Sequence, residues 1–391
     1  MERAADVTWR GYSLAERDRR WAAVRARAAE AGFDCILVPK GNHLDARYLT
    51  QLVDAVFILP TDGRAPIAFA EHPHGNDWVP DARPPHGSKR FASPPIADVL
   101  IELGMERARI GVSGLGIGTY THVRAADGVV NYGAYVEVLR RLPNARFEDA
   151  TDLVGLVRYV KSDEEIACLR RATAISEAGI DEIVEIARPG IDEAYLYARV
   201  TARMQELGSE STEWALRTGF PGGEEPERFT RPPIGRRLQH GTLITNEVGC
   251  TWGGIGASDV QPVLLAPIPE TWKPIIDLQR EAFDAGLERL QPGTPLREFI
   301  ESFCRFGGER GRITTSIHGR GLGDDGPLII PRTESDELGD VRIEKGTTWV
   351  WKPTARATNG QAAFQWGGSV VVTERGGESL SQRAHGLVSI P

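Results

Sequence analysis

Four side chains of this sequence could together carry out proton transfer: Glu247, Asp259, His318 and Lys352. An imidazole titrates near neutral pH and can act as acid or base, and either carboxylate could orient His318. The alternative for His318 is a histidine that is held by hydrogen bonds in a buried cleft. Lys352 could form a structural ion pair with Glu247, or it could be a catalytic amine whose pKa is lowered by an apolar wall.

Other side chains are candidates for substrate binding. Arg320 follows His318 by two residues in a Gly-rich segment and could hold a substrate carboxylate through its guanidinium, although a surface salt bridge is equally compatible. Four tryptophans could line an aromatic pocket for a planar or apolar ligand: Trp252, Trp349, Trp351 and Trp366. The alternative for each tryptophan is ordinary core packing.

Composition excludes several classes of function. The chain has 391 residues, is 41% hydrophobic and carries a formal net charge of -8, so it has no basic surface for nucleic acid or an anionic membrane. No apolar run approaches the length of a membrane span, and the charged N-terminus is not followed by a signal-peptide core. The four cysteines are widely spaced, which favours reduced thiols in a cytoplasmic protein.

The pattern of elements predicts an α+β protein with two domains. Residues 1–154 alternate helix and strand signals, with short apolar runs of strand length at 35–38, 56–59, 66–70 and 109–112. Residues 155–391 begin with a capping box at Ser162–Glu165 and a long helix that breaks at residues 188–190. A second helix, broken at residues 291–293, repeats this arrangement and indicates internal duplication, which usually places a site between the halves.

Longer segments resemble a known superfamily. The stretch from Val160 to Glu193, together with LQHGTLITNEVG, IHGRGLG, IEKGTTWVWKP and SVVVTERGGESLS, resembles the creatinase/prolidase/aminopeptidase P superfamily. The resemblance covers almost the whole chain. It implies a pita-bread catalytic domain after a smaller creatinase-type α/β domain, usually in a homodimer whose small domain caps the neighbouring site.

The resemblance also implies which positions would hold two metal ions in the family. Glu247 matches the first aspartate, and Asp259 matches the second in a stretch that is one residue longer than usual. His318 matches the ligand histidine, whereas Lys352 and Gly367 stand where the family has its two glutamates. At three further site positions this chain has a different residue from the family. Asp325 and Thr230 stand where the family has a histidine, and Gln365 stands where an arginine is common.

The charges at these positions argue against a dinuclear centre. Two carboxylates and one ammonium leave about one negative charge for two divalent cations, and the ammonium repels them. A single zinc ion on Glu247, Asp259 and His318 is the remaining metal alternative. We therefore expect no metal and no cofactor.

Three functional hypotheses follow. The first is a metal-independent, creatinase-like enzyme that cleaves a C–N bond in a small polar molecule by histidine acid/base catalysis. The second is a non-catalytic protein of the same fold that binds a ligand or partner. The third is a metal-dependent Xaa-Pro peptidase with a reduced ligand set, against which Lys352 and Gly367 argue.

Overall fold

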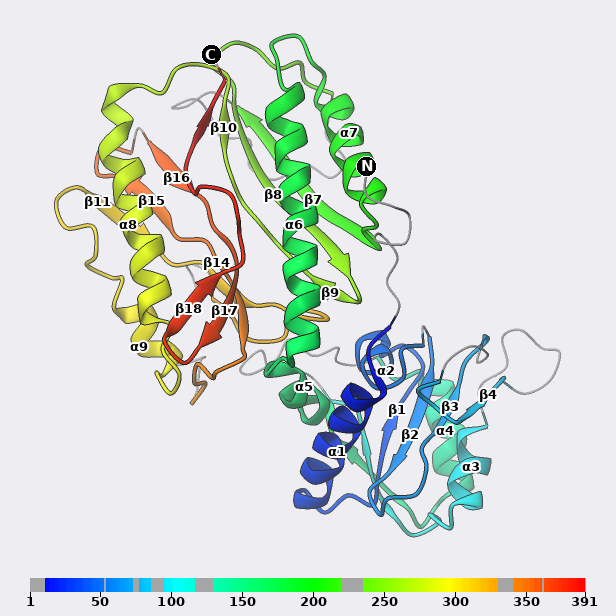
Figure 1. Ribbon diagram of the computed structural model, residues 1–391. Coiled ribbons are helices and arrows are strands. Elements are labelled where there is room, and N and C mark those ends of the chain that lie inside the picture. The colour runs from blue at the N-terminus through cyan, green and yellow to red at the C-terminus, as the bar shows by residue number, and fades with distance from the viewer. Residues whose placement is uncertain are drawn as a thin grey trace. The chain divides into compact units, whose positions relative to one another are not determined.

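The computed structural model describes residues 11–52, 54–72, 77–85, 95–116, 129–219, 235–329, 340–360 and 362–390 (Figure 1). The chain divides into two compact units, the first from Gly11 to Tyr159 and the second from Val160 onward. The predicted domain boundary lies within the last helix of the first unit, at residues 151–159.

The first unit is an α/β layer structure around one six-stranded sheet. Its elements are α1 (Leu14–Glu30), β1 (Cys35–Val38), α2 (His43–Thr50), β2 (Val56–Pro60), β3 (Ile67–Phe69), β4 (Asp81–Arg83), α3 (Ile96–Glu102), β5 (Arg109–Val112), α4 (Tyr132–Arg141), β6 (Arg146–Asp149) and α5 (Thr151–Tyr159). The strand order is β4-β3-β2-β1-β5-β6. β1, β5 and β6 run parallel, and β2 runs antiparallel to β1. The predicted strands at 35–38 and 109–112 are confirmed.

Buried apolar strands and capped helices account for the fold of the first unit. β1 and β2 are buried along their whole length, as expected for strands covered on both faces. The side chains of Ser13, Asn42 and Asn131 cap α1, α2 and α4 by accepting a hydrogen bond from the first helical turn. The core of this unit contains Leu37, Val56, Ile96, Val112 and Val138.

The second unit combines long helices with antiparallel sheets. Its helices are α6 (Asp163–Ile186), α7 (Glu193–Glu206), η2 (Glu270–Trp272), α8 (Lys273–Arg289) and α9 (Leu296–Glu301). The predicted capping box is confirmed, because Ser162 and Glu165 exchange both hydrogen bonds at the start of α6. α6 ends at Ile186, just before the predicted break at Arg188-Pro189-Gly190.

The strands of the second unit form three sheets. They are β7 (Ser211–Gly219), β8 (Leu243–Trp252), β9 (Ile255–Gly256), β10 (Val263–Leu264), β11 (Gly311–Thr314), β12 (Ile317–Gly319), β13 (Leu328–Ile329), β14 (Thr348–Trp351), β15 (Thr354–Ala357), β16 (Ala363–Gln365), β17 (Gly368–Thr373), β18 (Gly376–Ser379) and β19 (Val388–Ser389). The sheets have the orders β19-β10-β8-β7, β11-β15-β16 and β13-β12-β14-β17-β18, and β9 also pairs with β8.

The two halves of this unit each carry a long helix against their strands. α6 packs against β8, and α8 packs against β15 and β18 (Figure 1). Within the described ranges, no helix has the length and apolar character that crossing a membrane requires. The sheets bring β8, β12 and β14 into one unit, and these strands carry or adjoin the candidate site residues.

Candidate active site

The centre of the site is an ion pair between Glu247 and Lys352. Glu247 lies on β8, and Lys352 directly follows β14, which is held between β12 and β17. The Lys352 ammonium contacts Oε1 of Glu247, and the Ser258 hydroxyl donates a hydrogen bond to the same oxygen at 3.0 Å. The Lys352 side chain is 9% exposed and that of Glu247 is 29% exposed, so the pair is largely shielded but still reaches solvent.

The charge state of Glu247 follows from these neighbours. Burial alone would raise its pKa, but the charge and hydrogen bond of Lys352, assisted by His318 and Ser258, lower the pKa to about 2. Glu247 is therefore ionised at neutral pH. Its negative charge is balanced by an ammonium that the chain itself provides.

The side chains of Asp259 and Glu247 lie on opposite faces of the sheet that contains β8. Val248 and Asp259 form an antiparallel bridge, with both N–H···O hydrogen bonds at 2.8 Å. Directly opposed residues in an antiparallel pair point to the same face, whereas neighbours along a strand point to opposite faces. Ser258 accordingly shares the face of Glu247, and Asp259 shares the face of Val248. Because the stretch between Glu247 and Asp259 is one residue longer than usual in the family, the two carboxylates lie on opposite faces of the sheet.

The surroundings of Asp259 favour its protonated form. Burial and the carboxylate of Glu177 on α6 raise the pKa of Asp259 far above its usual range. The backbone N–H of Ser369 and the positive charges of Arg320 and Lys352 lower the pKa, but they offset this rise only in part. Neither carboxylate oxygen makes a well-formed hydrogen bond with a described residue. A Cβ at Gly368 would overlap Oδ1 of Asp259, so this glycine makes room for the acid.

His318 is a buried, neutral imidazole on β12. Its Nδ1 lies 3.1 Å from the carbonyl oxygen of Gly319 and 3.5 Å from Oδ1 of Asp324. Burial lowers the pKa of His318, and Asp324 opposes this shift. Because a carbonyl can only accept, Nδ1 carries the proton and Nε2 remains as the acceptor. His318 can thus accept a proton at neutral pH.

Arg320 and Asp325 hold the loop after His318. Arg320 donates hydrogen bonds to the carbonyl oxygens of Gly256 at 3.2 Å and Ala257 at 3.1 Å, and to Asp324 at 3.1 Å. Oδ2 of Asp325 lies 3.6 Å from the Lys161 ammonium, and both side chains are at most 1% exposed. These contacts anchor the loop to β9 and to the segment that precedes α6. Of the two alternatives for Arg320, the salt bridge is the one that its contacts match.

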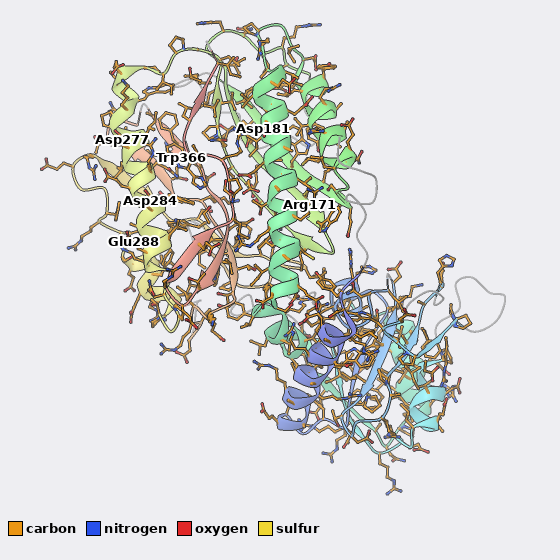
Figure 2. All side chains as sticks on the ribbon, in the orientation of Figure 1. Arg171, Asp181, Asp277, Asp284, Glu288 and Trp366 are labelled. Atoms are coloured by element: carbon orange, nitrogen blue, oxygen red, sulfur yellow. The ribbon has the colours of Figure 1, made fainter. Side chains whose placement is uncertain are left out.

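The candidate tryptophans lie in the protein interior. Trp351 is fully buried, donates a hydrogen bond to the Phe283 carbonyl at 3.1 Å and contacts the rings of Phe299 and Phe303. Trp366 is also fully buried and lies beside α8, whose acidic residues Asp277, Asp284 and Glu288 are exposed (Figure 2).

Trp252 and Gln365 also make internal contacts. Trp252 is 7% exposed and lies under the guanidinium of Arg171, while the Gln365 amide donates to the Lys352 carbonyl at 3.2 Å. Trp349 is fully buried as well and donates a hydrogen bond to the Thr347 hydroxyl at 2.9 Å. Core packing therefore describes the four tryptophans, and an aromatic substrate pocket stays a prediction. Thr230, the remaining candidate, lies outside the described residues.

The residues present do not fit the pair of metal ions that the resemblance implies. Glu247 is engaged by Lys352, Asp259 faces away, and Gly367 offers no side chain. A Cβ at Gly367 would overlap the Trp351 carbonyl oxygen, and its φ of +147° is unfavourable for other residues. Across the ranges that the structure covers, no group of three or more His, Cys, Asp or Glu side chains could hold a metal ion.

Sequence reasoning did not identify Ser258, Asp324, Glu177 or Lys161. The extra residue between Glu247 and Asp259 could have pointed to Ser258. A shift of one residue in an antiparallel pair exchanges the two faces, so Ser258 takes the face on which Asp259 was expected. Asp324 lies in the loop after His318, four residues beyond Arg320, so its position in the chain offered a signal. Glu177 and Lys161 are joined to the site only by tertiary contacts, for which no spacing in the chain gives a signal.

Comparisons with known proteins agree with this architecture. Residues 167–374 match the family described as Metallopeptidase family M24. An uncharacterized hydrolase/peptidase, y4tM of Sinorhizobium fredii, is 28% identical over 211 residues, covering 53% of this chain and 51% of that protein. The chain thus spans about half the length of that relative. Ectoine hydrolase of Halomonas elongata is 26% identical over 273 residues, covering 63% of this chain and 64% of that protein.

A solved structure extends the likeness to nearly the whole chain. The Xaa-Pro dipeptidase from Bacillus anthracis superposes with a TM-score of 0.76 at 18% identity, covering 95% of this chain and 99% of that one. This likeness confirms the α+β pita-bread fold, and the resemblance to the creatinase/prolidase/aminopeptidase P superfamily is confirmed with it.

Proposed function

We propose, on the premise that this chain belongs to metallopeptidase family M24, that it hydrolyses a C–N bond in a small polar molecule without a metal ion. The observation that carries the proposal is the Lys352–Glu247 ion pair, which supplies a fixed positive charge where the family resemblance calls for a carboxylate ligand. An internal ammonium neutralises the acid and disfavours a divalent cation beside it.

His318 serves as the proton-transfer residue in this proposal. Its Nε2 accepts a proton from the attacking water as the new C–O bond forms, and it returns this proton to the leaving nitrogen as the C–N bond breaks. The lowered pKa keeps the imidazole neutral before the reaction, as a general base requires. The carbonyl of Gly319 keeps Nδ1 protonated and fixes this tautomer.

Lys352 and Glu247 supply the charges around the reacting group. One donor of the Lys352 ammonium is directed to Glu247, and the others can stabilise the oxygen on which negative charge develops. Glu247 holds the ammonium in position and remains ionised throughout. The exposed part of Glu247 gives this group contact with solvent and hence with a dissolved substrate.

The relatives support C–N bond hydrolysis and suggest the compounds to test. Ectoine hydrolase of Halomonas elongata acts on ectoine by its name, and a solved structure of similar fold is an Xaa-Pro dipeptidase. The full-length protein is incubated with excess EDTA and with ectoine, creatine or glycyl-proline, and the products are followed by liquid chromatography and mass spectrometry. Turnover of ectoine or creatine in the presence of the chelator is expected.

The role of His318 is tested in the same assay. His318→Ala should lower kcat by about 100-fold or more, the usual contribution of a general base. His240→Ala, at an exposed histidine outside the site, is the matched control and should retain activity. Turnover that requires added Mn²⁺ and stops with EDTA would instead support the Xaa-Pro peptidase alternative.

A second candidate is a ligand-binding protein without turnover. The observation that favours it is the internal pairing of the charged groups, since Lys352, Arg320 and Asp325 all contact other residues of the chain. This candidate predicts saturable calorimetric binding of one of these compounds with no product after prolonged incubation. Product formation that His318→Ala abolishes would exclude it.

A further inference from the structure

We propose that the first unit contains a second binding site, for a small monoanionic carboxylate with an apolar body. The site is a cavity of about 530 Å³, and the described residues that line it all belong to this unit. This volume lies within the range of small-molecule pockets. The proposal is independent of the chemistry proposed for His318.

The cavity lies where open α/β sheets bind ligands. Leu37 and Val112 stand at the carboxyl ends of the parallel strands β1 and β5, and Val56 begins the antiparallel β2 at the same edge. The chain continues from β1 through β2, β3 and β4 on one side, whereas β5 and β6 lie on the other. Crevices at such a reversal of strand order are the usual ligand sites of this architecture.

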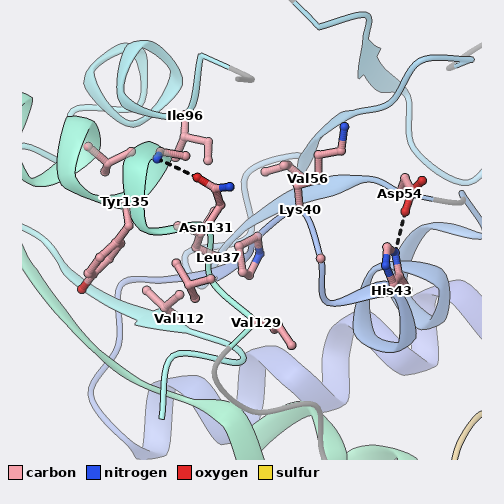
Figure 3. Close-up of a pocket in the computed structure, with 15 residues that line it drawn as sticks. Leu37, Lys40, His43, Asp54, Val56, Ile96, Val112, Val129, Asn131 and Tyr135 are labelled. Atoms are coloured by element: carbon pink, nitrogen blue, oxygen red, sulfur yellow. Dashed lines mark hydrogen bonds and ion pairs between the residues drawn. The ribbon is translucent and has the colours of Figure 1, made fainter. Parts of the chain in front are cut away.

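The cavity has an apolar interior. Leu37, Val56, Ile96, Val112 and Val138 line it, and each is at most 6% exposed (Figure 3). An aliphatic chain placed among these side chains would leave water, which favours binding by roughly 25 cal/mol per Å² of apolar surface buried. The interior therefore fits a hydrocarbon body.

The polar groups of the cavity lie at its rim. Lys40 follows β1, and His43 forms an ion pair with Asp54 at 2.5 Å (Figure 3). The ammonium of Lys40 is the one lysine or arginine charge among the described lining residues, and the carboxylate of Asp54 is engaged by His43. Asn131 and Tyr135 add neutral polar groups. A single ammonium at the rim of an apolar cavity favours a ligand with one carboxylate.

Two helices direct their N-termini to this rim. α2 begins at His43 and α4 at Tyr132, and residues of both first turns line the cavity. The partial positive charge of a helix N-terminus favours an anion. The two helix N-termini and the Lys40 ammonium together favour a carboxylate at the rim, and the apolar cavity holds the body of the ligand.

The backbone beside the cavity is in an unusual conformation. Asp54, which lines the cavity, has a positive φ of 55°; the other non-glycine residue with positive φ in the described chain is Gln51, the C-cap of α2. Such conformations are costly and concentrate at binding sites. At Asp54 this conformation accompanies the contact between its carboxylate and His43 on the rim.

Octanoate and 1-octanol are the probes, measured with the full chain by isothermal titration calorimetry. Octanoate should bind with one-to-one stoichiometry and more tightly than 1-octanol. Lys40→Gln should weaken octanoate about threefold to fivefold, as for a solvent-exposed charge pair, and leave 1-octanol unchanged. Lys273→Gln, at an exposed lysine of the second unit, is the matched control and should bind octanoate normally.

A second variant fills the cavity. Ala134→Phe should abolish binding of both probes, while His318→Ala should leave it intact, which separates this site from the candidate active site. Soaking crystals with 8-bromooctanoate gives a readout that needs no folded variant, because anomalous scattering should place bromine among Leu37, Val112 and Val138. Absence of octanoate binding, binding that neither Lys40→Gln nor Ala134→Phe alters, or bromine located only elsewhere would overturn the proposal.

Discussion

The ammonium of Lys352 contacts the carboxylate of Glu247 across a separation of 105 residues in the chain. β8 supplies the acid and the end of β14 supplies the base, so the pair joins two different sheets of the second unit. Its presence gives the site an internal charge balance.

Removal of Lys352 should destabilise the protein more than removal of the whole pair. Lys352→Met leaves the mostly buried Glu247 carboxylate uncompensated, which should cost about 2 kcal/mol of unfolding free energy, less than for a fully buried pair. Lys352→Met/Glu247→Gln should recover part of this loss. Urea unfolding measures both values. Lys345→Met, which breaks an exposed pair with Glu374, is the control and should leave the free energy of unfolding nearly unchanged. Equal losses in Lys352→Met and Lys345→Met would count against a paired site.

Glu247 should make stability depend on acid pH. Its pKa is about 2 in the folded protein and near 4.5 when unperturbed, so its stabilising contribution is present above about 4.5 and is lost as the pH falls toward 2. The difference in Tm between the wild type and Glu247→Gln should therefore shrink across this interval. A difference that stays constant from pH 6 to pH 2.5 would show that Glu247 has no lowered pKa.

Asp259 should have the opposite pH dependence. Its pKa is raised in the folded protein, so the stabilisation by its proton is complete below the ordinary value of 3.8 and is lost as the pH rises. Asp259→Asn mimics the protonated acid and should equal or exceed the wild type in Tm at pH 8, with the gain declining toward pH 4. Asp277→Asn, at an exposed residue on α8, is the control and should not change this pH profile. A Tm penalty for Asp259→Asn that grows with pH would indicate an ionised carboxylate.

The buried pair of Lys161 and Asp325 should be important for stability. Asp325→Asn leaves the fully buried Lys161 ammonium without its counter-charge and should cost about 3 kcal/mol. Glu374→Gln, in the exposed pair with Lys345, should leave the free energy of unfolding nearly unchanged. Chemical unfolding of both variants gives the comparison. A small loss in Asp325→Asn, with unchanged structure, would show that this pair does not hold the loop after His318.

Features set by local sequence could be predicted. The apolar strands at 35–38 and 109–112, the capping box at Ser162–Glu165 and the end of α6 before Pro189 depend on neighbouring residues, and all are confirmed. The ion pair of Lys352 with Glu247 was one of two alternatives, because the sequence shows that charges exist but not where strands place them.

Features set by register and packing could not be predicted. Asp259 was grouped with Glu247, yet one additional residue in the hairpin turns its side chain to the other face of the sheet. For Trp351 the sequence left open a pocket wall or core packing, and it could not show that the residue packs under α8, where the missing side chain of Gly286 leaves space for its indole. Both outcomes depend on contacts between segments that lie far apart in the chain.

Elemental analysis of metal-loaded protein tests the central claim most directly. The full-length chain is incubated with excess MnCl₂, CoCl₂ or ZnCl₂, desalted and analysed by inductively coupled plasma mass spectrometry. Because Lys352 already neutralises Glu247 and Asp259 faces away from it, the wild type should retain well below one ion per chain. Retention of two ions per chain, lost on substitution of Glu247 or Asp259, would contradict this account.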